Sequence, residues 1–309
     1  MSDQLIRFVR DHFQTNEFIP LHAPVFPGRE KEYVADTIES TFVSSVGAYV
    51  DRFERDMADY TGSPKAVATV NGTAALHVAL KLAGVESGDL VITQPLTFVA
   101  TCNAIAYCNA EPVFIDVDRD TLGLSAKALE AWLDEHARLD SVGVCRTRAD
   151  NKVIRACVPM HTFGHPADLD GLVSVTSRWK IALVEDAAES LGSFYKGKHT
   201  GTFGALGTLS FNGNKTVTAG GGGAVVGEDE TLCSLVRHLT TTARAGSDYT
   251  HDRIGFNYRM TNLEAAIGCA QLEQVDVFVK KKRAIAARYN EALTDLPGVG
   301  SFPAPDWAE

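Results

Sequence analysis

A lysine and an aspartate in the middle of the chain have the types and placement that support covalent cofactor chemistry. Lys215 lies in a polar loop just before four consecutive glycines, 220–223, and Asp186 ends the apolar segment 181–186. A lysine amine forms a Schiff base with an aldehyde, and a carboxylate can keep a pyridinium nitrogen charged. The pair suggests pyridoxal 5′-phosphate (PLP), whereas a solvated lysine and a strand-end acid that caps a turn are the plain alternatives.

Four further residues could hold the phosphate and the ring of such a cofactor. Gly72 and Thr73 open a predicted helix, where backbone N–H groups bind phosphate, although the same residues fit an ordinary helix start. Ser210 lies five residues before Lys215 and could add a hydroxyl donor. Phe98 stands at the start of another predicted helix, where an aromatic ring is usually core but could stack on a planar cofactor.

The spacing of residues excludes two other kinds of site, a nucleotide-binding P-loop and a hydrolase nucleophile. A nucleotide-binding P-loop requires G-x-x-x-x-G-K-[ST], whereas Asn214 separates Gly213 from Lys215, and no helical pattern follows. The sequence also contains no G-x-S-x-G segment of the kind that carries a hydrolase nucleophile.

The segment HTFGHPAD contains His161, His165 and Asp168, which resemble a metal-binding cluster. Two histidines four residues apart share a face only on a helix, and Gly164 and Pro166 indicate a loop instead. We therefore expect no metal site.

Composition limits the class of protein. The 309 residues are 45% hydrophobic, with net charge -10, which argues against a nucleic-acid or membrane-surface partner. The basic run 280–283 lies in a helical pattern and reads as a solvated face. Six cysteines without a C-x-x-C pair, no signal peptide and no apolar run long enough to span a membrane predict a reduced, cytoplasmic protein.

Apolar runs alternate with helical patterns from about residue 64 onward, which predicts an α/β fold with a largely parallel, covered sheet. Ligands in such sheets bind at the carboxyl ends of the strands, where the candidate residues lie. The expected strands are 66–70, 90–93, 112–117, 153–160, 181–185, 207–211 and 224–226, and the expected helices are 74–82, 98–108, 125–136 (capped by Ser125), 167–179 and one long helix over 261–293.

Eight ordered blocks together resemble the DegT/DnrJ/EryC1/StrS family of PLP-dependent sugar aminotransferases. The resemblance implies a fold-type-I architecture, with a mostly parallel seven-stranded sheet flanked by helices. It implies a PLP-binding large domain over 1–255, including an N-terminal segment 1–60, followed over 256–309 by the long helix and the start of a truncated C-terminal small domain. The blocks are residues 42–54, 70–80, 94–105, 110–121, 184–193, 210–215, 220–226 and 255–268.

The resemblance also implies roles for the residues around the cofactor ring. Lys215 would attach PLP covalently and act in catalysis, and Asp186 would pair with the pyridine nitrogen. Phe98 occupies the aromatic position that stacks on the ring. Glu189 stands where the family usually has a polar residue, often His or Gln, near the cofactor.

The phosphate would be held by residues of two subunits. Gly72, Thr73 and Ser210 would contact it from one chain, and Asn257 would reach it from the neighbouring subunit. The resemblance thus implies a homodimer with shared active sites.

The closest likeness is to enzymes of the legionaminic acid and bacillosamine type. We therefore predict transfer of an amino group from glutamate to a 4-keto-6-deoxy sugar nucleotide, UDP-linked, in surface polysaccharide or nonulosonic sugar biosynthesis. One branch of the family replaces the lysine by histidine and dehydrates its substrate, so Lys215 favours transamination. Two alternatives stay open: another PLP reaction on the same fold, and a truncated, non-catalytic PLP-binding protein.

Overall fold

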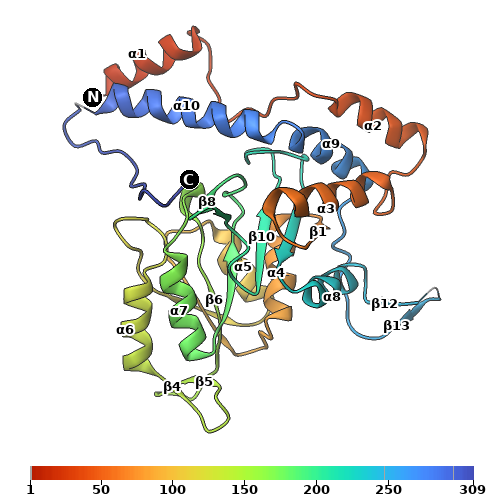
Figure 1. Cartoon of the computed structure of the whole chain (residues 1–309), viewed down its shortest axis with the longest axis vertical. Coiled ribbons are helices and arrows are strands. Elements are labelled where there is room, and N and C mark those ends of the chain that lie inside the picture. Colours follow the sequence, from red (N-terminus) through yellow and green to blue (C-terminus); the bar gives the residue numbers. More distant parts are fainter. Residues whose placement is uncertain (1, 247, 295) are drawn as a thin grey trace.

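The centre of the protein is a seven-stranded sheet, seen in a computed structural model that describes residues 2–246, 248–294 and 296–309 (Figure 1). The strand order is β1-β11-β10-β7-β6-β2-β3; β11 pairs antiparallel with both β1 and β10, and the other neighbouring strands pair in parallel. The mostly parallel sheet predicted from the sequence is therefore confirmed. Its strands are β1 (Lys65–Thr69), β2 (Leu90–Thr93), β3 (Glu111–Phe114), β6 (Ile154–Val158), β7 (Ala182–Asp186), β10 (Leu206–Ser210) and β11 (Gly223–Gly227).

Helices cover both faces of the sheet because neighbouring residues of each strand point to opposite faces. In β1, Val67 packs in one apolar cluster with α4 (Gly72–Leu82), α5 (Val99–Tyr107) and α8 (Glu230–Thr240). Ala66 and Ala68 pack on the other face. There the cover is provided by α3 (Ala48–Thr61), α9 (Asn262–Leu272), α6 (Ala126–His136) and α7 (Leu169–Trp179).

Smaller elements lie around this three-layer body. The helix α1 (Ser2–Phe13) lies beside α10 (Val275–Leu293), where the rings of Phe8 and Tyr289 meet edge to face (Figure 1). The last residues of the chain run along the strand formed by residues 194–195, with Phe194 and Glu309 exchanging backbone hydrogen bonds. The others are α2 (Glu30–Glu39), a 3₁₀ turn (Thr162–Gly164) and the pairs β4 (Ala137–Leu139)–β5 (Cys145–Thr147), β8 (Phe194–Tyr195)–β9 (Lys198–His199) and β12 (Arg244–Ala245)–β13 (Thr250–His251).

The prediction of a single long helix over 261–293 is wrong, because the chain forms two helices there, α9 and α10. No glycine or proline stands between them, so the apolar periodicity continued through the break. The break follows tertiary contacts: Glu273, just after α9, accepts a hydrogen bond of 2.6 Å from Tyr33 Oη and pairs with Arg52. Gln274 then bonds back to Gln271 in a tighter turn.

Helix starts follow the expected capping chemistry. Ser125 caps α6 by accepting a hydrogen bond from Ala128 N, which confirms the predicted cap. Asn71 accepts one from Ala74 N at the start of α4. Thr261 and Glu264 form a reciprocal capping box at α9. These side chains fix where each helix begins. The first residue of α4, Gly72, lines the candidate active site.

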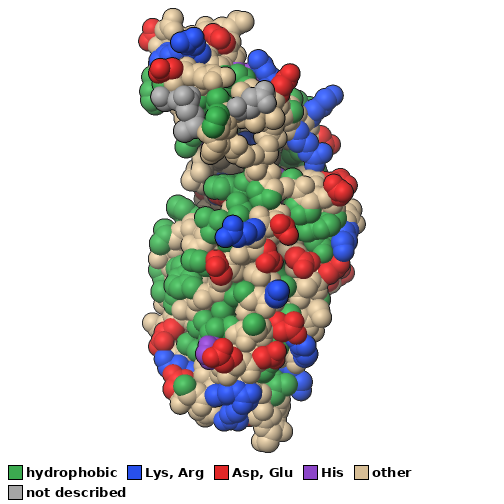
Figure 2. Space-filling view, turned by 90° about the vertical axis from the view of Figure 1, so that its left-hand side faces the viewer, with side chains coloured by type: hydrophobic (Ala, Val, Ile, Leu, Met, Phe, Trp, Pro, Cys, Tyr) green, Lys and Arg blue, Asp and Glu red, His purple; other side chains and the backbone are tan. Residues whose placement is uncertain are grey.

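The surface and the cysteines agree with a globular composition. All cysteines are free thiols, and five of the six are buried. Residues 280–283 on α10 are exposed, as expected for a solvated face. Figure 2 shows basic and acidic side chains interspersed on the face that it presents. Within the described residues, no helix is long and apolar enough to cross a lipid bilayer.

Candidate active site

A cavity of about 260 Å³ opens at the carboxyl edge of the sheet. Residues that end or follow β1, β2, β6, β7 and β10 converge there, together with the start of β11, which runs the opposite way and so begins at this edge. Seven of the eight residues predicted from the sequence line this one cavity: Gly72, Thr73, Phe98, Asp186, Glu189, Ser210 and Lys215.

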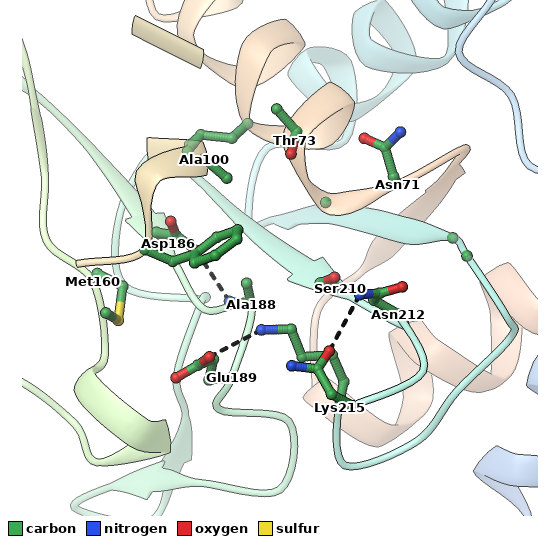
Figure 3. A pocket seen from close by; sticks show the side chains of 16 residues that line it. Asn71, Thr73, Ala100, Met160, Asp186, Ala188, Glu189, Ser210, Asn212 and Lys215 are labelled. Carbon is green, nitrogen blue, oxygen red and sulfur yellow. Dashed lines mark hydrogen bonds and ion pairs between the residues drawn. The ribbon is translucent and has the colours of Figure 1, made fainter. Parts of the chain in front are cut away.

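Lys215 points its amine into the cavity toward a carboxylate (Figure 3). Its Nζ donates a hydrogen bond of 3.0 Å to Oε1 of Glu189, and the lysine side chain is 13% exposed. The loop after β10 is held by a turn in which Lys215 N bonds to Asn212 O. The lysine is therefore sheltered and paired, rather than solvated as a typical loop lysine is.

Asp186, the last residue of β7, presents a buried carboxylate to the cavity. Thr101 donates a hydrogen bond of 2.7 Å to Oδ2, and Ala188 N donates one of 3.2 Å to Oδ1. Burial raises the pKa of Asp186, while the hydrogen bond from Thr101 and the charge of Lys215 act against that rise. A cationic ring nitrogen placed here would compensate for the burial of this charge.

Glu185, the neighbour of Asp186, points to the other side of the strand and anchors the loop after β9. Its carboxylate is fully buried and accepts hydrogen bonds from Gly201 N at 2.7 Å, Phe203 N at 2.6 Å and Gly204 N at 2.8 Å. Burial acts to raise the pKa of Glu185, but the bond from His161 and the backbone donors outweigh it and lower this pKa. This network fixes the strand end that carries Asp186.

The start of α4 and the end of β10 form a narrow cradle. The first N–H groups of a helix have no partner within it, and Gly72 and Thr73, the first residues of α4, line the cavity together with Ser210. A Cβ built on Gly72 would lie 2.8 Å from Cβ of Ser210. The cradle therefore requires glycine at position 72, because the two segments approach too closely for a side chain.

Substituting this glycine tests the cradle. Gly72→Ala should push Ser210 aside and weaken binding of PLP by about tenfold, the loss of one hydrogen bond to a charged group. Binding of pyridoxal, which lacks the phosphate, should change little. Titrating the apoprotein with each compound and following absorbance measures both constants, and an equal loss for the two compounds would contradict a phosphate cradle.

Phe98 is not a core residue, since it is 67% exposed at the N-cap position of α5 and lines the cavity. Its position suits a ring that stacks on a planar ligand. Asn257 is exposed and lies outside the cavity lining, in a segment bridged to Thr241. Within one chain, Asn257 and the cavity are therefore not brought together.

The expectation that HTFGHPAD is a loop is confirmed, since it forms a short 3₁₀ turn followed by extended chain. His161 is hydrogen-bonded to the buried carboxylate of Glu185. Asp168 caps α7 by accepting a hydrogen bond from Gly171 N. Among the described residues, no group of three or more His, Cys, Asp and Glu side chains is placed to hold a metal ion.

Several lining residues were missed from the sequence. Met160 follows β6, Ala188 lies two residues after Asp186, and Asn212 begins the turn that ends at Lys215 (Figure 3). Asn214, inside the same turn, also lines the cavity. Strand ends alone could have indicated Met160 and Ala188. Thr101, which bonds Asp186, had a fainter signal: it lies three residues after Phe98, on the same side of the helix start.

These residues fit PLP on structural grounds. The cavity contains a sheltered lysine, a buried carboxylate that forms no ion pair among the described residues, and a glycine cradle at a helix N-terminus. Each matches one part of the cofactor: the aldehyde, the ring nitrogen and the phosphate.

Comparison with known proteins agrees with this geometry. The model of the DegT/DnrJ/EryC1/StrS aminotransferase family matches residues 27–309. The chain belongs to this family. Its members use PLP, so the enzyme is a PLP-dependent aminotransferase with a fold-type-I architecture, as the resemblance implied.

Individual relatives span most of the chain. The GDP-perosamine synthase of Escherichia coli O157:H7 is 41% identical over 281 residues, covering 91% of this chain and 72% of that protein. The putative pyridoxal phosphate-dependent aminotransferase EpsN of Bacillus subtilis (strain 168) is 42% identical over 286 residues, covering 92% of this chain and 71% of that protein. The solved structure of the aminotransferase TlmJ from Streptoalloteichus hindustanus has a TM-score of 0.84 at 28% identity, covering 94% of this chain and 76% of that one.

Proposed function

We propose that this member of the DegT/DnrJ/EryC1/StrS family transfers an amino group from glutamate to a 4-keto-6-deoxy sugar nucleotide. The observation that carries the proposal is the placement of Lys215 and Asp186 in one cavity beside the glycine cradle. The sugar aminotransferases among its relatives support the substrate class, and the E. coli relative is named for a GDP-linked sugar. The prediction of a UDP-linked substrate is therefore tested against GDP-linked substrates.

The residues of the cavity divide the work of transamination. Bound PLP supplies an aldehyde that takes up the donor's amino group and a ring that accepts electron density when the adjacent C–H bond breaks. Asp186 keeps a proton on the ring nitrogen, which makes the ring a better electron acceptor. Phe98 would stack on the ring of the cofactor, and the cradle of Gly72, Thr73 and Ser210 would hold its phosphate.

Lys215 is the residue that we expect to transfer protons during the reaction. Its free Nζ would remove the α-proton of the donor and would deliver a proton to the carbon that bore the aldehyde. Glu189 Oε1, 3.0 Å from Nζ, holds the amine at the cavity wall by a charge-assisted hydrogen bond. The same residues act in reverse when the keto sugar accepts the amino group.

The substrate is tested with 4-keto-6-deoxy sugars linked to UDP or to GDP. With glutamate present, we expect formation of 2-oxoglutarate and of an amino sugar in equal amounts, measured by coupled assay and mass spectrometry, for one of the two nucleotide series. Release of water from the sugar without incorporation of nitrogen would indicate the dehydratase alternative. Conversion of glutamate without amination of either series would contradict the proposed acceptor.

The proposal includes a homodimer in which Asn257 completes the partner's site. Its support is that Asn257 is exposed and lies away from the cavity of its own chain. The segment that bears it is firmly held: Val70 N bonds to Tyr258 O, and buried Arg259 pairs with buried Glu54. A rigid, exposed arm of this kind suits a contact with a second chain.

Mixing two inactive variants tests the shared site. Lys215→Ala lacks the anchor, and Asn257→Asp places a carboxylate against the partner's phosphate, so each homodimer should be impaired. Refolding a 1:1 mixture should recover about a quarter of the wild-type activity, since half the dimers are mixed and each has one intact site. Absence of any recovery, with mixed dimers shown by mass spectrometry, would mean that Asn257 acts within its own chain, and an Asn257→Asp homodimer with wild-type activity would mean that it does not act in the site.

A further inference from the structure

A chain of two hydroxyl groups leads from half-buried Thr97, just before α5, to the buried carboxylate of Asp186. Thr101 is fully buried, and its Oγ1 lies 2.7 Å from Asp186 Oδ2 and 2.8 Å from Thr97 Oγ1. A hydroxyl has a single proton, and an ionised carboxylate only accepts hydrogen bonds. Thr101 must therefore donate to Asp186, and Thr97 must donate to Thr101.

The direction of this chain has an electrostatic consequence. Hydrogen bonds arranged donor to acceptor in sequence polarise one another, and they are strongest where they end on a charge. Burial raises the pKa of Asp186, and the bond from Thr101 is the largest influence against that rise. A weaker bond from Thr97 Oγ1 to Phe98 O, at 3.3 Å, competes with its bond to Thr101.

The same helix start also carries the aromatic face of the site. Phe98 is the N-cap residue of α5, and Thr101 bonds back to it through its backbone N–H at 3.1 Å. One turn of helix thus presents an exposed ring to the cavity and a hydroxyl to Asp186. Any shift of this turn would move both groups together.

We infer that Thr101, supported by Thr97, is a positioning residue that holds Asp186 ionised and oriented for the ring nitrogen of the cofactor. The inference rests on the PLP site of the proposed function and not on the identity of the amino acceptor. It specifies where the effect of Thr101 must appear: in binding that depends on the ring nitrogen, and not in binding that depends on the phosphate or on cavity shape.

Two probes separate these effects. PLP has the ring nitrogen, whereas 1-deaza-pyridoxal phosphate has a C–H in its place and is otherwise alike. Apoprotein is titrated with each probe, and the absorbance change gives the two dissociation constants. Thr101→Val keeps the shape of the side chain and removes the donor, so it should weaken PLP binding by about tenfold and leave binding of the deaza analogue unchanged.

Companion variants make the result specific. Thr101→Ser keeps the hydroxyl and should restore wild-type binding of PLP. Thr97→Val, at a half-buried position, should weaken PLP binding in the same sense but less, and it carries the test if Thr101→Val does not fold. Thr176→Val is the matched control, because Thr176 is buried and its hydroxyl bonds only helix carbonyls, at 2.7 Å to Leu172 O.

Equal losses for PLP and the deaza analogue would overturn the inference, since Thr101 would then only shape the cavity. Unchanged PLP binding in Thr101→Val would overturn it as well. Both outcomes presuppose that the wild-type protein binds PLP in the same titration; failure of the wild type to bind would instead contradict the proposed function itself.

Discussion

Replacement of Lys215 by alanine is expected to abolish covalent attachment of PLP and to lower transamination by roughly three orders of magnitude or more. General acid–base catalysis by a positioned group contributes about 10²–10⁴-fold on its own, and Lys215 also provides the attachment point. Its amine is sheltered and directed into the cavity, and Lys215 is the one lysine among the described residues that line the cavity. The measurement is the rate of 2-oxoglutarate release under saturating PLP and glutamate.

Two controls separate this loss from a structural defect. Lys215→Arg keeps a cation beside Glu189 but has no primary amine, so it should be as inactive as the alanine variant while retaining the ion pair. Lys198→Ala removes an exposed lysine that pairs with Glu228 on the surface, and it should leave activity unchanged. Substantial turnover by Lys215→Ala at unchanged PLP occupancy would contradict the catalytic role of this residue.

Replacement of Asp186 by asparagine is expected to lower transamination by roughly 10²–10⁴-fold, the effect of about 3–5 kcal/mol for breaking a buried charge pair. The amide keeps the size of the carboxylate and can accept the hydrogen bond from Ala188 N, so the geometry is largely preserved. What is lost is the negative charge that keeps a proton on the ring nitrogen. Activity within a few-fold of wild type would show that the ring does not need this charge.

The same substitution should stabilise the protein when no cofactor is bound. Because burial raises the pKa of Asp186 in the folded state, its ionised form destabilises the fold at pH values above the ordinary range for aspartate. Apoprotein Asp186→Asn should therefore melt at a higher temperature than wild-type apoprotein near neutral pH. The difference should shrink as the pH falls into the range where aspartate is protonated in both states. A lower melting temperature at neutral pH would contradict this account.

Much of the site follows from strand ends read in the sequence. Asp186 and Ser210 end apolar runs, and Gly72 follows another. In a parallel sheet these ends meet at one edge, so a prediction of strands with their directions already places the side chains together. The lysine loop belongs to the same edge because it follows β10 directly.

The rest depended on contacts between distant segments. The break between α9 and α10 lies at Glu273, which Tyr33 and Arg52 bind from a distant part of the sequence. The local sequence around Glu273 does not predict these contacts. Thr101 reaches Asp186 across 85 residues of sequence. The expected role of Asn257 remains a prediction, because it concerns a second chain. The division of the sequence into parts 1–255 and 256–309 also stays a prediction, although α9 packs tightly on α3, where Gly268 meets the ring of Phe53.

Lys215 is proposed here as the covalent anchor of a working transaminase. The most direct measurement is the visible absorption of the protein with PLP before and after glutamate, followed by borohydride reduction and peptide mapping. We expect a band that glutamate bleaches and, in protein reduced before glutamate is added, a cofactor adduct on the peptide that contains Lys215. An adduct on another lysine, or a band that glutamate leaves unchanged, would contradict it.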